Sequence, residues 1–240
     1  MAFFHRQTLS IKLQCSIMKP KDLKFPYQWE DRKPLISDRV FFIPKLYDPC
    51  EKVLLPPFFE RLAPVWIEYC SGNGAWIVEK AKTHPERNWI AVEKRFERVQ
   101  KIWSKIKNAH IDNLFIVCGE ALHFTTYYVP CDYFEGIYIN FPDPWPKPRH
   151  AKHRLLQHSF ISQMARVSKR DAEVMIVSDH KEYVDCVCKE FLAHCDWAPK
   201  FASPYFVTEW DGYGASYFDS LWRMRGKTIH YLQFSNKKDA

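Results

Sequence analysis

One carboxylate, that of Asp143, stands between prolines in the segment of residues 140–154, which reads NFPDPWPKPRHAKHR. Because a proline fixes φ and removes a backbone donor, the four prolines of this segment exclude a helix or a central strand and predict a stiff loop. Trp145 follows the acid closely, and no acid interrupts the basic residues that come next, which are Lys147, Arg149, His150, Lys152, His153 and Arg154. An acid and a flat ring beside positive charge suit a pocket for a heteroaromatic ring next to a phosphate-binding surface.

A second candidate site is a pair of glycines, Gly72 and Gly74, between the apolar run 65–68 and a helical pattern at 75–81. In an open α/β sheet the first strand-to-helix loop is the usual place for a nucleotide-like cofactor. Glycines there let the backbone approach the cofactor, because no Cβ intervenes. Glu93 ends the next apolar run, 19 residues past Gly74, where a carboxylate can accept both hydroxyls of an adenosine ribose.

The loop also indicates which class of cofactor it would take. Ile77 stands where a dinucleotide fingerprint places its third small residue, and a bulky side chain there would crowd a pyrophosphate. A cofactor without a pyrophosphate is therefore favoured over a nicotinamide dinucleotide, and S-adenosylmethionine meets that description. A third acid, Glu120, follows the third apolar run and is placed to reach the adenine end.

Apolar runs that alternate with helical patterns would position these loops. The runs are residues 65–68, 89–92, 114–118, 134–139 and 174–177, with a further strand-like run at 228–234. Helical spacing is found in two sets, which are Phe96, Val99, Ile102, Trp103 and Ile106, and Leu156, Phe160, Met164 and Val167. Alternation at this pitch predicts βαβ units and an α/β fold with a parallel sheet covered by helices on both faces.

Residues 1–60 differ from the rest of the chain. Seven of the 16 prolines lie between Pro20 and Pro57, and no helical periodicity persists there. We predict a partly extended N-terminal arm over residues 1–60 and one domain over residues 61–240. No signal peptide or long apolar run is found, which predicts a soluble, cytoplasmic protein that does not act at a membrane.

Charge and cysteine content point weakly to a partner and away from a metal. Lys and Arg exceed Asp and Glu by 35 − 28 = 7, a mild excess that is compatible with a polyanionic partner. The eight cysteines are scattered and predict no disulfide framework. The group Cys186, Cys188, His194 and Cys195 lacks the paired spacing of structural zinc sites, so no metal site is predicted.

Together these motifs resemble the bacterial tRNA (guanine-N(7)-)-methyltransferase family over about residues 60–235. The FPDPWPK segment followed by a basic run is the most specific feature, since the glycine loop alone would match many methyltransferases and dehydrogenases. The other matching residues are Glu68 ahead of the glycine loop, Glu93, Glu120 with Ala121, Ser178 with Asp179, and Thr208, Glu209, Trp210 and Asp211.

The resemblance implies a class I methyltransferase fold, with a mostly parallel seven-stranded sheet. It implies methyl transfer from S-adenosylmethionine to the N(7) atom of a guanosine in the variable loop of tRNA. The residues implied for cofactor binding are Glu68, Gly72, Gly74, Glu93, Glu120, Ala121 and Asp143, with Asp143 also at the methyl-transfer centre. Those implied for the tRNA side are Lys147, Arg149, His150, Lys152, Arg154, Asp179, Thr208, Glu209 and Asp211. We expect a monomer, with a homodimer as the alternative.

Three positions depart from the family pattern. Cys70 stands where the family usually has glycine, so the loop must tolerate a Cβ there. Glu120 replaces a frequent aspartate, and Trp210-Asp211 replaces the more usual Tyr-Glu. The last two changes keep the negative charge.

Two other functions stay open on the sequence. Asn140-Phe141-Pro142-Asp143 is similar to the polar-Pro-Pro-aromatic loop of enzymes that methylate exocyclic base amines. The chain could also be a tRNA-binding subunit without catalysis of its own.

Overall fold

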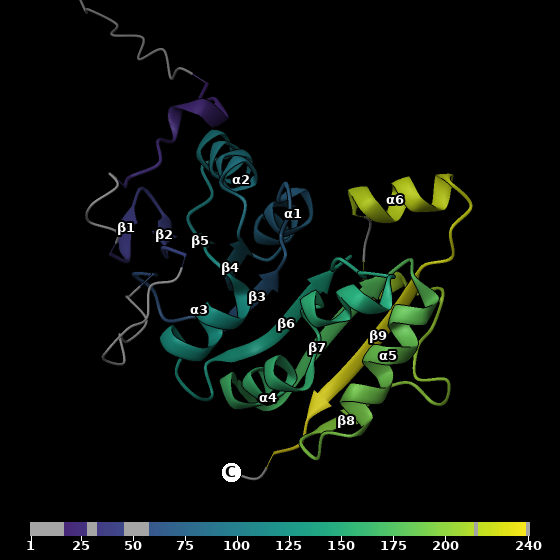
Figure 1. The fold of residues 1–240 in the computed structure, drawn as a ribbon. Coiled ribbons are helices and arrows are strands. Elements are labelled where there is room, and N and C mark those ends of the chain that lie inside the picture. Colours follow the sequence, from purple (N-terminus) through teal and green to yellow (C-terminus); the bar gives the residue numbers. More distant parts are fainter. Residues whose placement is uncertain (1–16, 28–32, 46–57, 214–215, 239–240) are drawn as a thin grey trace, which may run out of the picture.

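The computed structural model describes residues 17–27, 33–45, 58–213 and 216–238. In this part of the chain nine strands form one sheet in the order β1-β2-β5-β4-β3-β6-β7-β9-β8 (Figure 1). The strands are β1 (Leu35–Ser37), β2 (Val40–Phe42), β3 (Val65–Tyr69), β4 (Asn88–Glu93), β5 (Leu114–Cys118), β6 (Phe134–Asn140), β7 (Ser168–Ser178), β8 (Trp197–Pro199) and β9 (His230–Asn236). Five of the eight neighbouring pairs are parallel, which confirms the predicted mostly parallel sheet.

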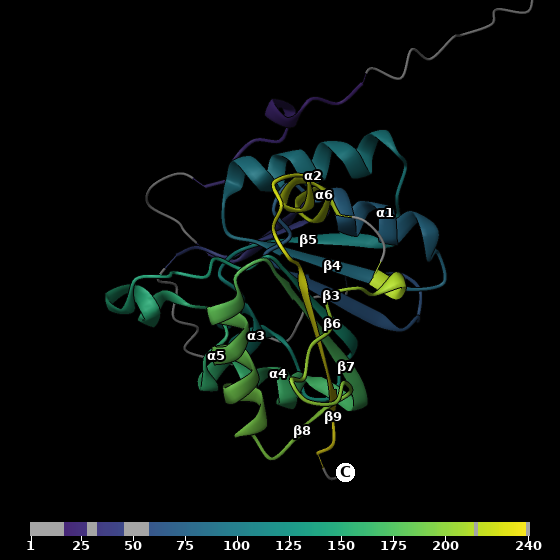
Figure 2. The ribbon, with the colours of Figure 1, turned by 90° about the vertical axis from the view of Figure 1, so that its right-hand side faces the viewer.

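Helices cover both faces of this sheet, as predicted (Figure 2). They are α1 (Ala75–Thr83), α2 (Phe96–Asn108), α3 (Ala121–Tyr128), α4 (His158–Val167), α5 (Lys181–Leu192) and α6 (Tyr217–Met224), with short 3-10 helices η1 (Pro20–Asp22), η2 (Pro148–His153) and η3 (Asp211–Tyr213). Helices α1 and α2 lie on one face, and α3, α4 and α5 lie on the other. None of the helices in the described ranges has both the length and the apolar character needed to span a bilayer.

Each face of the sheet has its own hydrophobic core, because alternate strand residues point to opposite faces. Ile67 and Tyr69 of β3 enter the core under α3, α4 and α5. Trp89 and Ala91 of β4 enter the core under α1 and α2. Strands buried on both faces are apolar nearly throughout, which is why they stood out as continuous apolar runs.

The sheet has nine strands, not the predicted seven. The two additional strands, β1 and β2, come from the region predicted as an arm, and β2 pairs in parallel with the edge of β5. Val40, Phe41 and Phe42 of β2 are all buried. A three-residue strand is too short to show a periodicity, so the sequence pattern missed it.

The register of the parallel strands brings their carboxyl ends to one edge of the sheet. Tyr69 of β3 pairs with Val92 of β4 and with Ile139 of β6. Glu93 of β4 pairs with Cys118 of β5. The loops that follow these strands therefore leave the sheet side by side, and they carry most of the predicted site residues.

Candidate functional site

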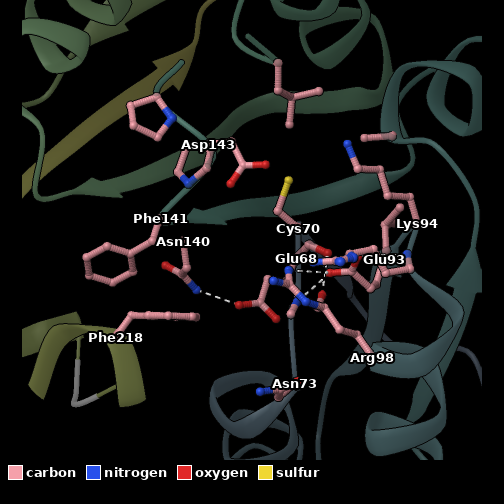
Figure 3. Close-up of a pocket in the computed structure, with 18 of the residues that line it drawn as sticks. Glu68, Cys70, Asn73, Glu93, Lys94, Arg98, Asn140, Phe141, Asp143 and Phe218 are labelled. Atoms are coloured by element: carbon pink, nitrogen blue, oxygen red, sulfur yellow. Dashed lines mark hydrogen bonds and ion pairs between the residues drawn. The ribbon is translucent and has the colours of Figure 1, made fainter. Parts of the chain in front are cut away.

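A cleft of about 1080 Å³ opens at the carboxyl ends of the parallel strands (Figure 3). One wall is the glycine loop between β3 and α1, and another is the proline-rich loop after β6. The predicted residues that line the cleft are Glu68, Gly72, Gly74, Glu93, Glu120, Ala121, Asp143, His150, Lys152, Arg154 and Asp179. The folded chain thus gathers residues from five separate loops at one place.

The glycine loop follows a left-handed path. The φ angles are +62° at Cys70, +56° at Gly72 and +70° at Gly74, in the region that favours glycine. A Cβ on Gly74 would also lie 2.5 Å from Cγ1 of Ile102, so α2 packs too closely for any side chain there. Cys70 adopts this conformation although it has a side chain.

Glu93 ties the end of β4 to the glycine loop. Its Oε2 accepts a hydrogen bond from the backbone N–H of Gly72 at 3.0 Å, and its Oε1 accepts one from the N–H of Arg95 at 2.9 Å. The guanidinium of Arg98 lies 3.6 Å from Oε2. The side chain is only 4% exposed, so the carboxylate is fixed before any ligand binds.

Glu68, at the end of β3, has a buried carboxyl group whose two oxygens have different surroundings. Its Oε1 accepts a hydrogen bond from Nδ2 of Asn140 at 2.7 Å, whereas Oε2 has no hydrogen-bond partner within the described residues. Burial raises the pKa of Glu68 to about 7, although the hydrogen bond from Asn140 opposes the rise. The sequence indicated Glu68 but not Asn140, whose amide lies at the start of the proline-rich segment.

Asp143 is exposed on its loop, and its carboxylate points toward the thiol of Cys70 (Figure 3). Desolvation in the cleft, together with the nearby carboxylates of Glu93 and Asp143, raises the pKa of Cys70 to about 12. The loop itself is held in a rare conformation, since φ is +50° at Phe141 and +42° at Trp145. An acid therefore faces the glycine loop across the cleft from a rigid support.

The basic segment after the prolines divides into two kinds of residue. Lys152 is exposed, and it lines the cleft with His150. Arg154 instead holds the loop, because its Nε donates to the carbonyl of Pro144 at 3.0 Å and one Nη to that of Trp145 at 3.3 Å. Lys147 and Arg149 are exposed and lie outside the lining of the cleft.

Helix α6 forms a wall of the cleft that was not predicted from the sequence. Phe218 and Trp222 line the cleft, and the ring of Phe218 lies 5.9 Å from that of Phe141. Ser216 caps the helix by accepting a hydrogen bond from the N–H of Asp219 at 3.1 Å. The spacing Ser-x-x-Asp is a helix-start signal that the sequence offered.

The segment that carries Thr208, Glu209 and Asp211 does not line the cleft; it anchors α6. Arg223 of α6 donates to Oε1 of Glu209 at 3.1 Å and to the carbonyl of Thr208 at 3.3 Å. Asp211 is exposed at the start of η3. The predicted substrate role of these residues therefore stays a prediction, and the described contacts of Thr208 and Glu209 are with α6.

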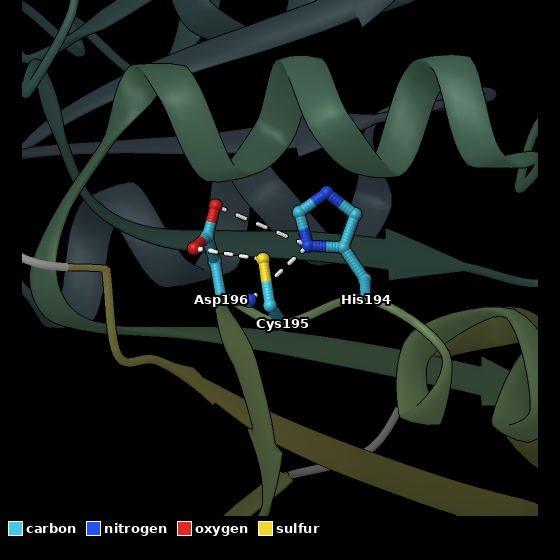
Figure 4. A group of neighbouring side chains, drawn as sticks. All are labelled: His194, Cys195 and Asp196. Atoms are coloured by element: carbon cyan, nitrogen blue, oxygen red, sulfur yellow. Dashed lines mark hydrogen bonds and ion pairs between the residues drawn. The ribbon is translucent and has the colours of Figure 1, made fainter.

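A group of potential metal ligands lies away from the cleft, in the turn between α5 and β8 (Figure 4). The ligand atoms of His194, Cys195 and Asp196 lie within 4.8 Å of one another. Nδ1 of His194 faces the backbone N–H of Asp196 at 3.3 Å, and Nε2 lies 3.1 Å from Oγ of Ser162. Both ring nitrogens are thus engaged in hydrogen bonds that shape the turn.

Comparison with known proteins gives both the family and the fold. The profile of a family described as "Putative methyltransferase" matches residues 62–209. A tRNA (guanine-N(7)-)-methyltransferase of Chlamydia muridarum is 46% identical over 90% of this chain and 97% of its own length. One of Chlamydia pneumoniae is 43% identical over 92% of this chain and 99% of its own.

Among solved structures, the 16S rRNA (adenine(1408)-N(1))-methyltransferase from Catenulisporales acidiphilia superposes with a TM-score of 0.52 at 16% identity, covering 76% of this chain and 90% of its own. At that identity the likeness concerns the fold alone. The arrangement is the class I methyltransferase fold expected from the sequence.

Proposed function

Since this chain belongs to the bacterial tRNA (guanine-N(7)-)-methyltransferase family, we propose that it methylates the N(7) atom of a guanosine in the variable loop of tRNA, with S-adenosylmethionine as the donor. One structural observation carries the proposal: a single cleft unites the glycine loop, the acids Glu68 and Glu93, and Asp143 of the proline-rich loop. A cleft of this kind at the carboxyl ends of parallel strands is where an α/β sheet binds its ligands.

The residues of the cleft fit S-adenosylmethionine, which would supply a methyl group on a positively charged sulfur. The unpartnered oxygen of Glu68 suits the ammonium group of the methionine portion. Glu93 suits the ribose hydroxyls, because a carboxylate has about four acceptor sites and only part of them are used here. Glu120 and Ala121, at the start of α3, suit the adenine end.

The work left to the protein is mainly alignment. N(7) of guanine has an in-plane lone pair and no proton at neutral pH, so its attack on a methyl group needs no general base. Holding two reactants in line contributes about 7–11 kcal/mol at most. The attack places positive charge on the guanine ring, and the carboxylate of Asp143 can stabilise this charge or accept hydrogen bonds that orient the base.

The tRNA side of the proposal rests on the basic loop. Lys152 and His150 line the mouth of the cleft, and Lys147 and Arg149 are exposed next to them. Cations in these places would contact phosphates and contribute to salt-dependent binding. Arg154 would support them by holding the loop.

The test is incubation of the protein with labelled S-adenosylmethionine and unmodified tRNA, followed by nucleoside analysis. Label in 7-methylguanosine is expected, and it should disappear when the variable-loop guanosine is replaced. Label on an exocyclic amine would support the alternative reaction. Tight tRNA binding without any labelling would instead indicate a non-catalytic subunit.

A further inference from the structure

Hydrogen bonds connect Tyr213 to Glu68, which lines the cleft. Tyr213 lies in η3 and has a buried side chain with a hydroxyl group. That hydroxyl donates to Oδ1 of Asn140 at 2.9 Å, and Nδ2 of Asn140 donates to Oε1 of Glu68 at 2.7 Å (Figure 3). A residue near the C-terminus is thus joined to the carboxylate at the end of β3.

Because the residues of this network are buried, each of its hydrogen bonds contributes to stability. Tyr213 is 1% exposed, Glu68 is 2% exposed and Asn140 is 8% exposed. A buried hydrogen-bonding group that loses its partner is destabilised, because water cannot replace the partner. The network is therefore sensitive to the loss of a single hydroxyl.

The Tyr213 hydroxyl decides which way the Asn140 amide faces. An amide has an oxygen that accepts and a nitrogen that donates, so its two ends are not equivalent. When Oδ1 accepts from Tyr213, Nδ2 is directed at Glu68. A reversed amide would place its oxygen against the carboxylate, and the two oxygens would repel each other unless Glu68 carried a proton.

We propose that Tyr213 is a positioning residue for the methyl-donor site, acting through Asn140 on the carboxylate of Glu68. The inference rests on the proposed function, because it takes the ligand of Glu68 to be the cationic methionine portion of S-adenosylmethionine.

The expected effect has a pH signature. Burial is the main cause of the raised pKa of Glu68, the bond from Asn140 lowers it, and the nearby charge of Glu93 raises it. The other titratable groups facing Glu68 are Cys70 and Tyr213, and burial raises the pKa of both. Glu68 becomes charged as the pH rises through its pKa, so affinity for a cation should rise over the same interval. Loss of the orienting hydroxyl should move that interval to higher pH.

The sharpest variant is Tyr213→Phe, which removes the hydroxyl and keeps the ring. The ring is held independently by stacking on Trp76 (centroids 5.8 Å apart) and Trp210 (6.5 Å). The matched control is Tyr138→Phe, because the ring of Tyr138 packs against the same Trp76 (4.5 Å), whereas its hydroxyl makes no hydrogen bond to Asn140 or Glu68 in the described part of the chain.

The measurement is calorimetric titration of S-adenosylmethionine into wild type, Tyr213→Phe, Glu68→Gln and the double variant between pH 5.5 and 9. Tyr213→Phe should weaken binding about tenfold near pH 7, at the upper end of what a hydrogen bond between neutral groups contributes. Its affinity curve should be displaced to higher pH, and Tyr138→Phe should match wild type. In the Glu68→Gln background, Tyr213→Phe should have little further effect, because the two residues act in series.

Equal weakening by Tyr213→Phe in both backgrounds, or an unmoved pH curve, would overturn the inference. If thermal melting shows that Tyr213→Phe is unfolded, Asn140→Ala serves instead and should move the curve in the same direction. A wild-type protein that does not bind S-adenosylmethionine would contradict the proposed function itself. That outcome is distinct from a wild type that binds and a Tyr213→Phe variant that binds equally well.

Discussion

At the scale of single residues, Cys70 has a side chain in a backbone conformation that favours glycine. Its φ of +62° brings Cβ close to the following carbonyl, which destabilises an L-residue by about 1–2 kcal/mol. The glycine loop nonetheless keeps its left-handed path, which shows that the packing of Gly74 on Ile102 and the bond from Gly72 to Glu93 determine the loop.

The substitution Cys70→Gly should therefore stabilise the protein. We expect the free energy of unfolding to rise by about 0.5–1 kcal/mol, since the relief of strain exceeds the added freedom of the unfolded chain. Cys70→Val should lower it, because a β-branched residue is least suited to positive φ. Urea denaturation measures both. A clear loss of stability in Cys70→Gly would mean that the thiol makes contacts worth more than the strain.

Asp143 should affect turnover far more than donor binding. Asp143→Asn should lower kcat by about 10²–10³, as loss of one preorganised electrostatic contact to a transition state does. Its Kd for S-adenosylmethionine should change little. The matched control is Glu120→Gln, a second cleft carboxylate that should weaken donor binding with less effect on kcat. Parallel losses of affinity and turnover in Asp143→Asn would contradict the assignment of Asp143 to the transition state.

At the scale of elements, the proline-rich loop and η2 contain one cation that holds the loop and others that are exposed. Arg154 donates to two carbonyls of its own loop, and its guanidinium also lies over the ring of Tyr183 at 5.5 Å. Lys152 is exposed in the same segment. From the sequence alone, Lys152 and Arg154 are equivalent cations, whereas in the folded chain their surroundings differ.

Lys152→Ala and Arg154→Ala should therefore impair different properties. The first should impair tRNA binding, and the second should impair stability and turnover. Lys152→Ala should weaken tRNA binding and reduce the slope of log K against log salt by about 0.7–0.9, the loss of one phosphate contact. Arg154→Ala should lower the melting temperature and kcat, because the loop loses its internal hydrogen bonds. Binding titrations from 50 to 200 mM salt (roughly the range in which phosphate contacts dominate) distinguish them. An unchanged slope in Lys152→Ala would remove Lys152 from the interface.

The sequence predicted best those elements that are buried on both sides. Strand β5 was predicted with its observed bounds because all five of its residues are apolar and buried. Strand β7 starts earlier than the run 174–177, at Ser168, because Lys169, Arg170 and Asp171 are exposed and polar. Helix α6 was not predicted because only Asp219 of its eight residues is buried. Contacts such as that between Tyr213 and Asn140 join residues 73 apart and leave no local pattern.

At the scale of the whole molecule, the region predicted as an arm contributes to both cores. Phe41 of β2 packs on one face, with its ring 5.8 Å from Phe58 and 5.2 Å from Tyr128. Phe42 packs on the other face, near Phe96. Strand β2 also pairs with β5, whose backbone groups would otherwise form an open edge. Strand β2 therefore belongs to the folded body.

Phe41→Ala tests that conclusion. Removal of this buried ring should lower the free energy of unfolding by about 3–5 kcal/mol. Phe25→Ala, at a residue that is 48% exposed, should have a much smaller effect. Denaturant titration gives both values. Similar small losses in the two variants would show that β2 is loosely attached and that the boundary near residue 60 separates independent parts.

The raised pKa of Cys70 has a chemical consequence for an enzyme that handles an activated methyl group. A thiolate is a far stronger nucleophile than a ring nitrogen, and Cys70 points at the carboxylate where the transfer is proposed to occur. The raised pKa keeps the thiol of Cys70 protonated near pH 7. Desolvation in the cleft, helped by the carboxylates of Glu93 and Asp143, thus also keeps the protein from alkylating itself, so chemoselectivity is built into the same cleft as donor binding.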